Sequence, residues 1–206
     1  MRAGSRLASG LGFGAAYVVA IWAVHAINVL LFDHTLFALG VHPRDVSSLW
    51  HIFTAPLVHG DYAHLMSNTV PGAIFSFLIG VTGPRTWWEV TGIVVVCAGL
   101  GMWLTGGVGT THIGASGLVY GWLSYLVVRG LFNRSLRQIL LGVVLGSAYS
   151  YLIWGVLPGT AGVSWEGHLF GALGGILAAM VITSDDPQPR AGAGDRGGGA
   201  PHPVQP

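Results

Sequence analysis

Residues 111–130 have the sequence THIGASGLVYGWLSYLVVRG, in which an apolar run covers residues 116–128 and is followed by Arg129. A helix over this run is about 20 Å long, whereas the hydrocarbon core of a bilayer is about 30 Å thick. With Arg129 at one boundary, Ser116 lies roughly 10 Å below the other. Irregular backbone, such as the glycine-rich residues 105–115, is tolerated at that depth only if it is buried in protein or lines a wet cavity. This stretch therefore predicts a short membrane helix that begins at a submerged, hydrated hollow.

The composition of the chain agrees with a membrane location. Of its 206 residues, 52% are hydrophobic and 8% are charged, and the mean hydropathy is +0.63. A soluble domain carries about 25% charged residues because its surface faces water. The net charge of +1 gives no footprint for nucleic-acid binding, and the lone cysteine, Cys97, excludes an intrachain disulfide. All nine basic residues are arginine, a bias that indicates a GC-rich bacterial genome.

Six apolar segments of near-spanning length divide the chain. They cover residues 11–32, 63–80, 87–104, 116–128, 136–156 and 167–183. We therefore predict an all-α polytopic membrane protein, a bundle of six transmembrane helices over residues 11–183. A short segment, 1–10, precedes the bundle, and the tail, 184–206, is expected to be disordered because it is rich in Gly, Pro and Ala. The long connection 33–62 has helix-like patches at 46–57.

The arginines set the orientation of these segments. If the spans alternate in direction, eight of the nine arginines fall on one side of the membrane and only Arg44 on the other. The eight are Arg2, Arg6, Arg85, Arg129, Arg134, Arg137, Arg190 and Arg196. Because cytoplasmic loops carry the excess of positive residues, both termini of a multi-pass cell-membrane protein are expected in the cytoplasm. The second, fourth and sixth spans then all run from the outside inward.

Polar residues open each of these three spans. His64 and Asn68 start the second, Ser116 the fourth and His168 the sixth, so all four are expected at a similar depth. Polar residues inside a membrane are costly and usually functional. Each has a plainer interpretation on its own, because small residues around a serine favour close packing and His or Asn side chains bond to backbone or to a neighbouring helix. The shared depth favours a Ser116–His168 pair, in which the histidine activates the serine.

Glycines in the sixth span provide a route for that pairing. Gly167, Gly171 and Gly175 repeat every four residues and form one smooth helix face. If the fourth span packs against this face, His168, which projects beside it, comes within hydrogen-bond reach of Ser116.

His64 and Asn68 are four residues apart and share one helix face. Together with the Ser116 backbone N–H, they are candidate donors to a carbonyl oxygen that gains negative charge during acyl transfer. The alternative is a zinc site formed by His25, His59 and His64. The chain has no HExxH pattern, so we expect neither a metal nor another cofactor.

These residues, in this order, resemble the rhomboid family of intramembrane serine proteases over residues 11–183. The resemblance is carried by His64-Leu65-Met66-Ser67-Asn68, by Gly114-Ala115-Ser116-Gly117, and by His168-Leu169-Phe170-Gly171 with Gly175. It implies that Ser116 is the nucleophile and His168 its general base, with no acidic third member. It also implies that His64, Asn68 and the Ser116 N–H stabilise the oxyanion, and that Tyr120 stacks on His168.

The resemblance also implies the reaction and its partners. A transmembrane protein would be cleaved near the outer end of its helix through an acyl-enzyme, within the lipid bilayer and without a cofactor. One alternative is a non-catalytic rhomboid-like protein that binds transmembrane helices, although such relatives typically lack the serine or the histidine. Another is a small transporter, which would have inverted repeats, and the sequence has no such repeat. The sequence leaves open the oligomeric state, the physiological substrate, its preferred cleavage site and the element that admits it.

Further expectations concern residues around the site. The family's first loop often carries a Trp-Arg pair where this chain has Trp50-His51, which leaves the seating of that loop open. His112 is expected to cap backbone groups. Glu166 could tune His168, but an exposed loop acid is the plainer expectation.

Overall fold

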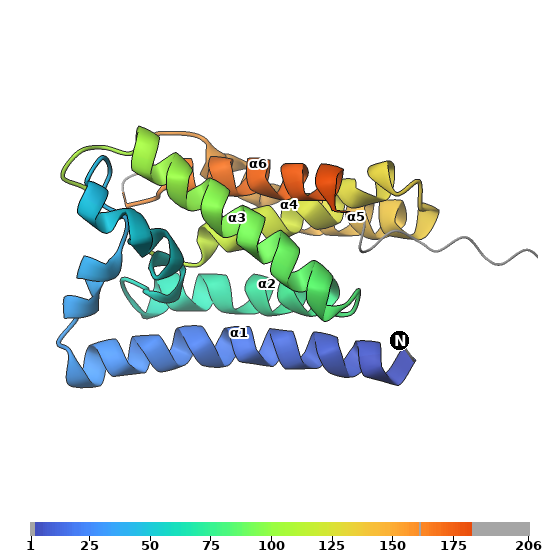
Figure 1. Cartoon of the computed structure of the whole chain (residues 1–206), viewed down its shortest axis with the longest axis horizontal. Coiled ribbons are helices and arrows are strands. Elements are labelled where there is room, and N and C mark those ends of the chain that lie inside the picture. The colour runs from blue at the N-terminus through green and yellow to red at the C-terminus, as the bar shows by residue number, and fades with distance from the viewer. Residues whose placement is uncertain (1–2, 161, 183–206) are drawn as a thin grey trace, which may run out of the picture.

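The computed structural model describes residues 3–160 and 162–182 (Figure 1). Within these ranges the chain forms α-helices and short 3-10 helices, and its one isolated β-bridge joins Val41 to His112. The α-helices are α1 (Ala3–Leu31), α2 (Tyr62–Gly80), α3 (Pro84–Thr105), α4 (Ser116–Phe132), α5 (Leu136–Ala148) and α6 (Trp165–Val181). The 3-10 helices are η1 (Thr35–Leu39), η2 (Val46–Phe53), η3 (Ala55–Leu57) and η4 (Ser150–Val156). The all-α prediction is confirmed. The predicted tail, 184–206, lies outside the described residues.

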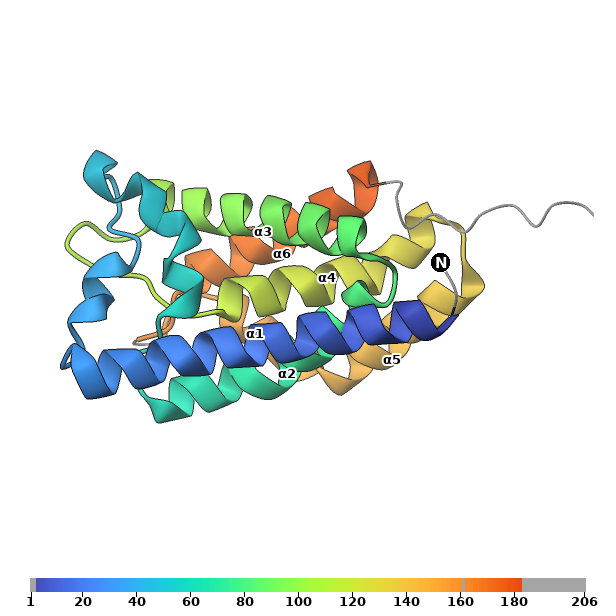
Figure 2. The ribbon, with the colours of Figure 1, turned by 60° about the horizontal axis from the view of Figure 1, so that its bottom comes forward.

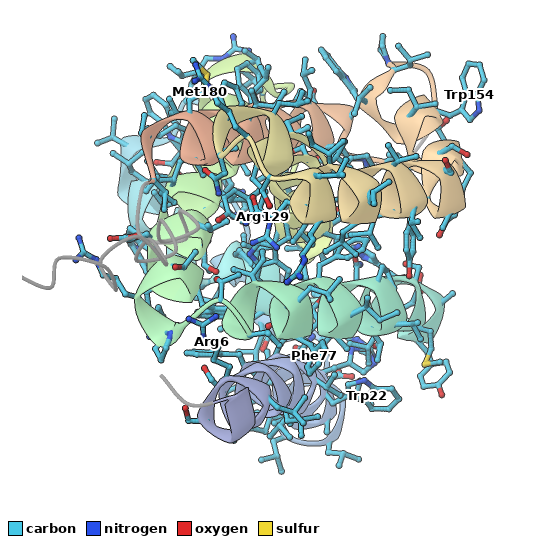
Figure 3. The ribbon with its side chains drawn as sticks, turned by 90° about the vertical axis from the view of Figure 1, so that its right-hand side faces the viewer. Arg6, Trp22, Phe77, Arg129, Trp154 and Met180 are labelled. Carbon is cyan, nitrogen blue, oxygen red and sulfur yellow. The ribbon has the colours of Figure 1, made fainter. Side chains whose placement is uncertain are left out.

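Helix α4 lies at the centre of the bundle (Figures 1 and 2). It contacts α2, α3, α5 and α6, while α1 packs on the outside of α2. Successive α-helices alternate in direction, so α2, α4 and α6 all begin at the end that carries the loop 32–61 (Figure 1). Figure 3 views the opposite end, where Arg6 and Arg129 lie. The starts of three helices therefore meet at one end of the bundle.

Aromatic side chains with satisfied polar tips form much of the interior. Trp122 is fully buried and donates its indole N–H to Thr91 Oγ1 at 3.1 Å. Tyr17 of α1 donates its hydroxyl to the Asn68 carbonyl oxygen at 3.0 Å and packs its ring edge-on against Trp122. Where lipid replaces water, such packing and interhelical hydrogen bonds hold helices together, and here they fix α1, α2 and α3 around α4.

Glycines bring α4 and α6 into close contact, as the predicted smooth face requires. A Cβ added at Gly171 would collide with the Gly117 carbonyl, and one added at Gly175 would collide with the Gly121 carbonyl. Gly167 differs, because a Cβ there would meet Met102 of α3. The two helices thus interdigitate at Gly171 and Gly175 with almost no side chain between their backbones.

The prediction of one continuous helix over 136–156 is wrong. α5 ends at Ala148, and α5 and η4 are bent by 69° relative to each other. Tyr149 between them has φ −109° and ψ 19°, outside the helical range. The carbonyls of Leu152 and Gly155 in η4 accept hydrogen bonds from side chains of α4 and α6. In a straight α-helix that ends at Val156, the Leu152 carbonyl would instead accept from the Val156 N–H.

The helices are those of a membrane protein, although the predicted count of six spans stays a prediction. Within the described ranges, α1 and α3 are each long and apolar enough to cross a membrane, and α5 with η4 adds a third candidate. Large apolar side chains are exposed, among them Leu30 at 78% and Trp154 at 71%. Figure 3 shows Trp154 pointing outward. A surface of this kind needs an apolar surrounding.

Besides the end of α5, two boundaries differ from the predicted ones by four residues or more. α1 begins at Ala3 instead of residue 11. α4 continues past Arg129 to Phe132, so the arginine is buried, with its guanidinium 5.4 Å from the centroid of the Tyr125 ring. The helix-like patches expected at 46–57 are confirmed as η2 and η3.

Candidate active site

Ser116 is the first residue of α4 and is reached through a tightly turned loop. Gly114 has a φ of +111°, a conformation that favours glycine, and an added Cβ there would collide with the His64 imidazole. The Ala115 N–H donates to His59 Nε2 at 3.3 Å. The backbone just before the serine is therefore held against α2 and the loop that precedes it. As the first helical residue, Ser116 also presents a backbone N–H for which the helix has no acceptor.

The Ser116 and His168 side chains are in contact, with 2.8 Å between Ser116 Oγ and His168 Nε2. On the other side of the ring, Nδ1 lies 2.8 Å from the Gly155 carbonyl oxygen. A carbonyl oxygen can only accept, so Nδ1 carries the hydrogen and Nε2 accepts from the Ser116 hydroxyl. The predicted contact is present, in the tautomer that a general base needs in order to take a proton from the serine.

Tyr120 stacks on the histidine, one helical turn after Ser116. The Tyr120 and His168 rings have centroids 4.1 Å apart and planes that differ by 8°. The Tyr120 hydroxyl donates to the Leu152 carbonyl oxygen at 2.8 Å. Because Leu152 and Gly155 both belong to η4, this short helix orients the tyrosine and the histidine together.

His64 and Asn68 occupy the first turns of α2. Asp61 caps that helix, and its carboxylate accepts from the His64 N–H at 2.7 Å. The Asn68 amide nitrogen donates to the His64 carbonyl oxygen at 2.9 Å. An amide nitrogen carries two hydrogens, so one Asn68 hydrogen is left for a ligand.

A cavity of about 730 Å³ collects these side chains. It is lined, among others, by His64, Asn68, Ser116, Tyr120 and His168. The volume lies in the range of small-ligand and peptide sites. The sequence-predicted polar residues are therefore gathered in one cavity, whereas Gly167, Gly171 and Gly175 serve helix contact outside it.

His59 was considered only as a metal ligand, yet it is a fully buried part of the site's support. Its Nδ1 lies 3.3 Å from the Leu57 carbonyl oxygen, so Nδ1 carries the hydrogen and Nε2 accepts from Ala115. Burial, and next to it the nearby His64 imidazole, lowers the pKa of His59 to about 4. A neutral His59 is thus the form that holds the loop before Ser116.

The expectations for His112 and Glu166 are wrong. The His112 ring bonds to two side chains rather than to backbone, with Nδ1 2.6 Å from Ser164 Oγ and Nε2 2.9 Å from Thr110 Oγ1. Glu166 is buried because α6 begins at Trp165, which places the carboxylate in the first helical turn, where the helix dipole favours it. Spacing along the chain could not reveal either arrangement, because both depend on how two loops meet.

The Trp50-His51 pair has a defined place in the first loop. Trp50 is exposed, and His51 Nδ1 lies 2.8 Å from the Gly40 carbonyl oxygen. Arg44, also in the first loop, donates to the Gly106 carbonyl oxygen at 2.8 Å. The first loop is therefore tied by Arg44 to the loop that leads to Ser116.

A metal centre has no geometric support in the described part of the chain. Across residues 3–160 and 162–182, no three His, Cys, Asp or Glu side chains are grouped so that they could hold a metal ion. His25, His59 and His64 therefore do not form the alternative zinc site.

Comparisons with known proteins identify the family of the chain. The family described as Rhomboid domain matches residues 46–185. Uncharacterized proteins of Mycobacterium tuberculosis and Mycobacterium bovis are each 40% identical over 192 residues, covering 82% of this chain and 80% of the relative. An uncharacterized protein of Mycobacterium leprae is 36% identical over 183 residues, covering 85% of this chain and 72% of the relative.

Proposed function

Since the chain belongs to the rhomboid family, we propose that it is an intramembrane serine protease that cleaves transmembrane proteins near the outer end of their helices. A family fold alone does not decide activity. The observation that carries the proposal is the chain of two 2.8 Å contacts from Ser116 through His168 to the Gly155 carbonyl.

The proposed reaction uses this pair in two steps. His168 Nε2 takes the Ser116 proton as Oγ attacks the scissile carbonyl carbon, and the resulting imidazolium then protonates the leaving amine. Water, deprotonated by the same nitrogen, next attacks the acyl-enzyme and releases Ser116. The Gly155 carbonyl keeps Nδ1 protonated and so supplies the orientation that an acidic residue gives in a triad.

Donors for the oxyanion are proposed at the start of two helices. The Ser116 N–H lies at the N-terminus of α4, where the helix dipole favours negative charge. Asn68, with its second amide hydrogen, and His64 both line the cavity. Preorganised donors of this kind contribute about 2.7–4 kcal/mol each to acyl transfer.

The proposed setting is a bundle that spans the membrane six times, with both termini in the cytoplasm. The alternating helices, and Arg6 and Arg129 at one end of the bundle, support this orientation. α4 and α6 have 17 residues each, or about 26 Å, which is shorter than the hydrocarbon core of about 30 Å. Ser116 and His168 would then lie below the outer surface of the bilayer. The outer end of a substrate's transmembrane helix, where that helix can unwind, would reach the same depth.

Fluorophosphonate labelling of the full chain in detergent tests the proposal. Wild-type protein is expected to incorporate the probe at Ser116, and Ser116→Ala and His168→Ala are expected to remain unlabelled. Ser147→Ala, at an exposed position of α5, is the matched control and should label like wild type. Cleavage of a model transmembrane substrate should follow the same pattern.

Two outcomes would contradict the proposal. One is wild-type labelling or cleavage in folded Ser116→Ala. The other is a folded wild-type protein that neither labels nor cleaves, which would favour the non-catalytic alternative, a protein that binds transmembrane helices.

A further inference from the structure

A second hydrogen bond, between His112 and Ser164, lies beside the proposed catalytic contact, on the side of the loops. His112 Nδ1 lies 2.6 Å from Ser164 Oγ, and Ser116 Oγ lies 2.8 Å from His168 Nε2. Both pairs join residues 52 positions apart in the sequence. His112 lies four residues before Ser116, and Ser164 lies four residues before His168. Segments 112–116 and 164–168 are therefore joined by a hydrogen bond at each end.

The direction of each hydrogen bond around His112 can be assigned. Thr110 donates its hydroxyl hydrogen to the Gly107 carbonyl at 2.6 Å, so its oxygen accepts from His112 Nε2. Nδ1 is then the acceptor, and the Ser164 hydroxyl donates to it. Ser164 Oγ in turn accepts from the Gly167 N–H at 3.4 Å as the N-cap of α6. Both ring nitrogens of His112 and both hydroxyls beside it therefore have hydrogen-bond partners, and these bonds fix the orientation of the imidazole.

The backbone of His112 is fixed as well. Its N–H donates to the Val41 carbonyl and its carbonyl accepts from the Val41 N–H, both at 2.9 Å. The residue is buried, with 8% of its surface exposed. It therefore joins the first loop, the loop before Ser116 and the cap of the helix that carries His168.

We infer that His112 is a positioning residue, whose bond to Ser164 sets the approach of Ser116 to His168. Below the site, the Gly117–Gly171 backbone contact holds α4 against α6. On the loop side of the site, α4 does not extend beyond Ser116. If the bond between His112 and Ser164 were lost, the loop could therefore shift Ser116 relative to α6. A misplacement of about 1 Å between reacting groups can lower a rate by about 100-fold.

The inference rests on the proposed protease activity, and the rate of fluorophosphonate labelling tests it. Two variants break the bond from either side. His112→Leu removes the imidazole, and Ser164→Gly removes the hydroxyl at a small capping cost. Each should label about 10- to 100-fold more slowly while reaching the wild-type final stoichiometry, and cleavage should lose kcat with KM unchanged. A merely structural defect would instead lower the final labelled fraction.

Three further variants complete the experiment. His112→Asn keeps an acceptor near the position of Nδ1 and should recover most of the rate. The double variant His112→Leu/Ser164→Gly should be no slower than the slower single variant, because both remove the same bond. Thr105→Val, at the other end of the loop, loses only a bond to the Gly101 carbonyl within α3 and should label at the wild-type rate.

The possible results separate this inference from the proposed function. Wild-type protein that labels no faster than Ser116→Ala overturns both. If wild type labels, then unchanged rates in Ser164→Gly, or losses that multiply in the double variant, overturn the role of His112 alone. Should His112→Leu fail to fold, Ser164→Gly and His112→Asn decide the question by the same rates.

Discussion

Tyr120 lies parallel to His168, with the two ring centroids 4.1 Å apart and the planes within 8°. The tyrosine is one turn after Ser116 on α4, and its hydroxyl is bonded to the Leu152 carbonyl. The His168 imidazole is therefore held by the Tyr120 ring on its face and by a carbonyl oxygen at Nδ1. Its other nitrogen, Nε2, faces the Ser116 hydroxyl. This confinement limits how the proposed base can turn, so its parts can be tested separately.

Tyr120→Ala is expected to lower kcat for cleavage by about 10- to 100-fold, because His168 gains room to rotate away from Ser116. Tyr120→Phe keeps the stacked ring and loses one hydrogen bond, so it should cost about 1 kcal/mol of stability and little activity. Steady-state kinetics together with thermal unfolding distinguish the two effects. Equal losses of kcat in both variants would show that stacking is not what holds the base.

Gly171→Ala is expected to destabilise the protein by about 1–3 kcal/mol, since its Cβ would be forced against the Gly117 carbonyl. It should also slow probe labelling by separating α4 from α6. Gly92→Ala on α3 is the matched control, because nothing lies within 4 Å of a Cβ there. Alanine is the better helix former, so the control should be neutral or slightly stabilised in a thermal shift assay. A Gly171→Ala protein as stable as Gly92→Ala would refute the packing argument.

Asn68→Ala should reduce kcat by about 100- to 1,000-fold with little change in KM, if the Asn68 amide donates to the oxyanion. Tyr17→Phe is the control for the fold around this residue, because Tyr17 donates only to the Asn68 backbone carbonyl. That variant should lose about 1 kcal/mol of stability and keep its kcat. Comparable kcat values for Asn68→Ala and wild type would remove the amide from the proposed mechanism.

Acid should destabilise the protein through His59, whose pKa of about 4 in the folded chain lies below the usual value of 6.5. Between these two values the unfolded chain binds the extra proton, so stability is full above pH 6.5 and falls as the pH drops toward 4. The loss amounts to at most about 3 kcal/mol. His59→Gln keeps an acceptor for the Ala115 N–H but cannot titrate. Its melting temperature should therefore fall less than that of wild type over this range, and identical pH profiles would argue against a buried neutral His59.

The contacts of the candidate site that depend on helix geometry could be predicted from the sequence. His64, Ser116 and His168 open three spans, and the arginine distribution places those openings at one end. The glycine repeat at 171 and 175 then predicts which helix face is approached, and the structure has α4 on that face. Tyr120 came from a family resemblance, and its position one turn after Ser116 suffices to bring the ring to His168.

The parts that were missed depend on loops and backbone. The break after Ala148 falls within residues 146–151, GSAYSY, which are less apolar than the residues on either side. The prediction of one span over 136–156 gave no weight to this dip. The partners of His112 lie two and 52 residues away in irregular segments, for which no periodicity applies. Glu166 was misjudged by the position of one helix start, and helix ends are the least certain feature of any sequence-based assignment.

The break in α5 has a consequence for how this protein can vary. Gly155 orients His168 through a peptide oxygen, which every amino acid possesses, yet any side chain there would strike the Tyr120 hydroxyl. An alanine scan would consequently report that position 155 does not tolerate a side chain. It would not reveal that the Gly155 carbonyl oxygen accepts a hydrogen bond from His168. Replacing the amide bond after Gly155 with an ester makes the carbonyl oxygen a weaker hydrogen-bond acceptor without adding an atom to the cavity. Only such an exchange would reveal the chemistry that the backbone contributes.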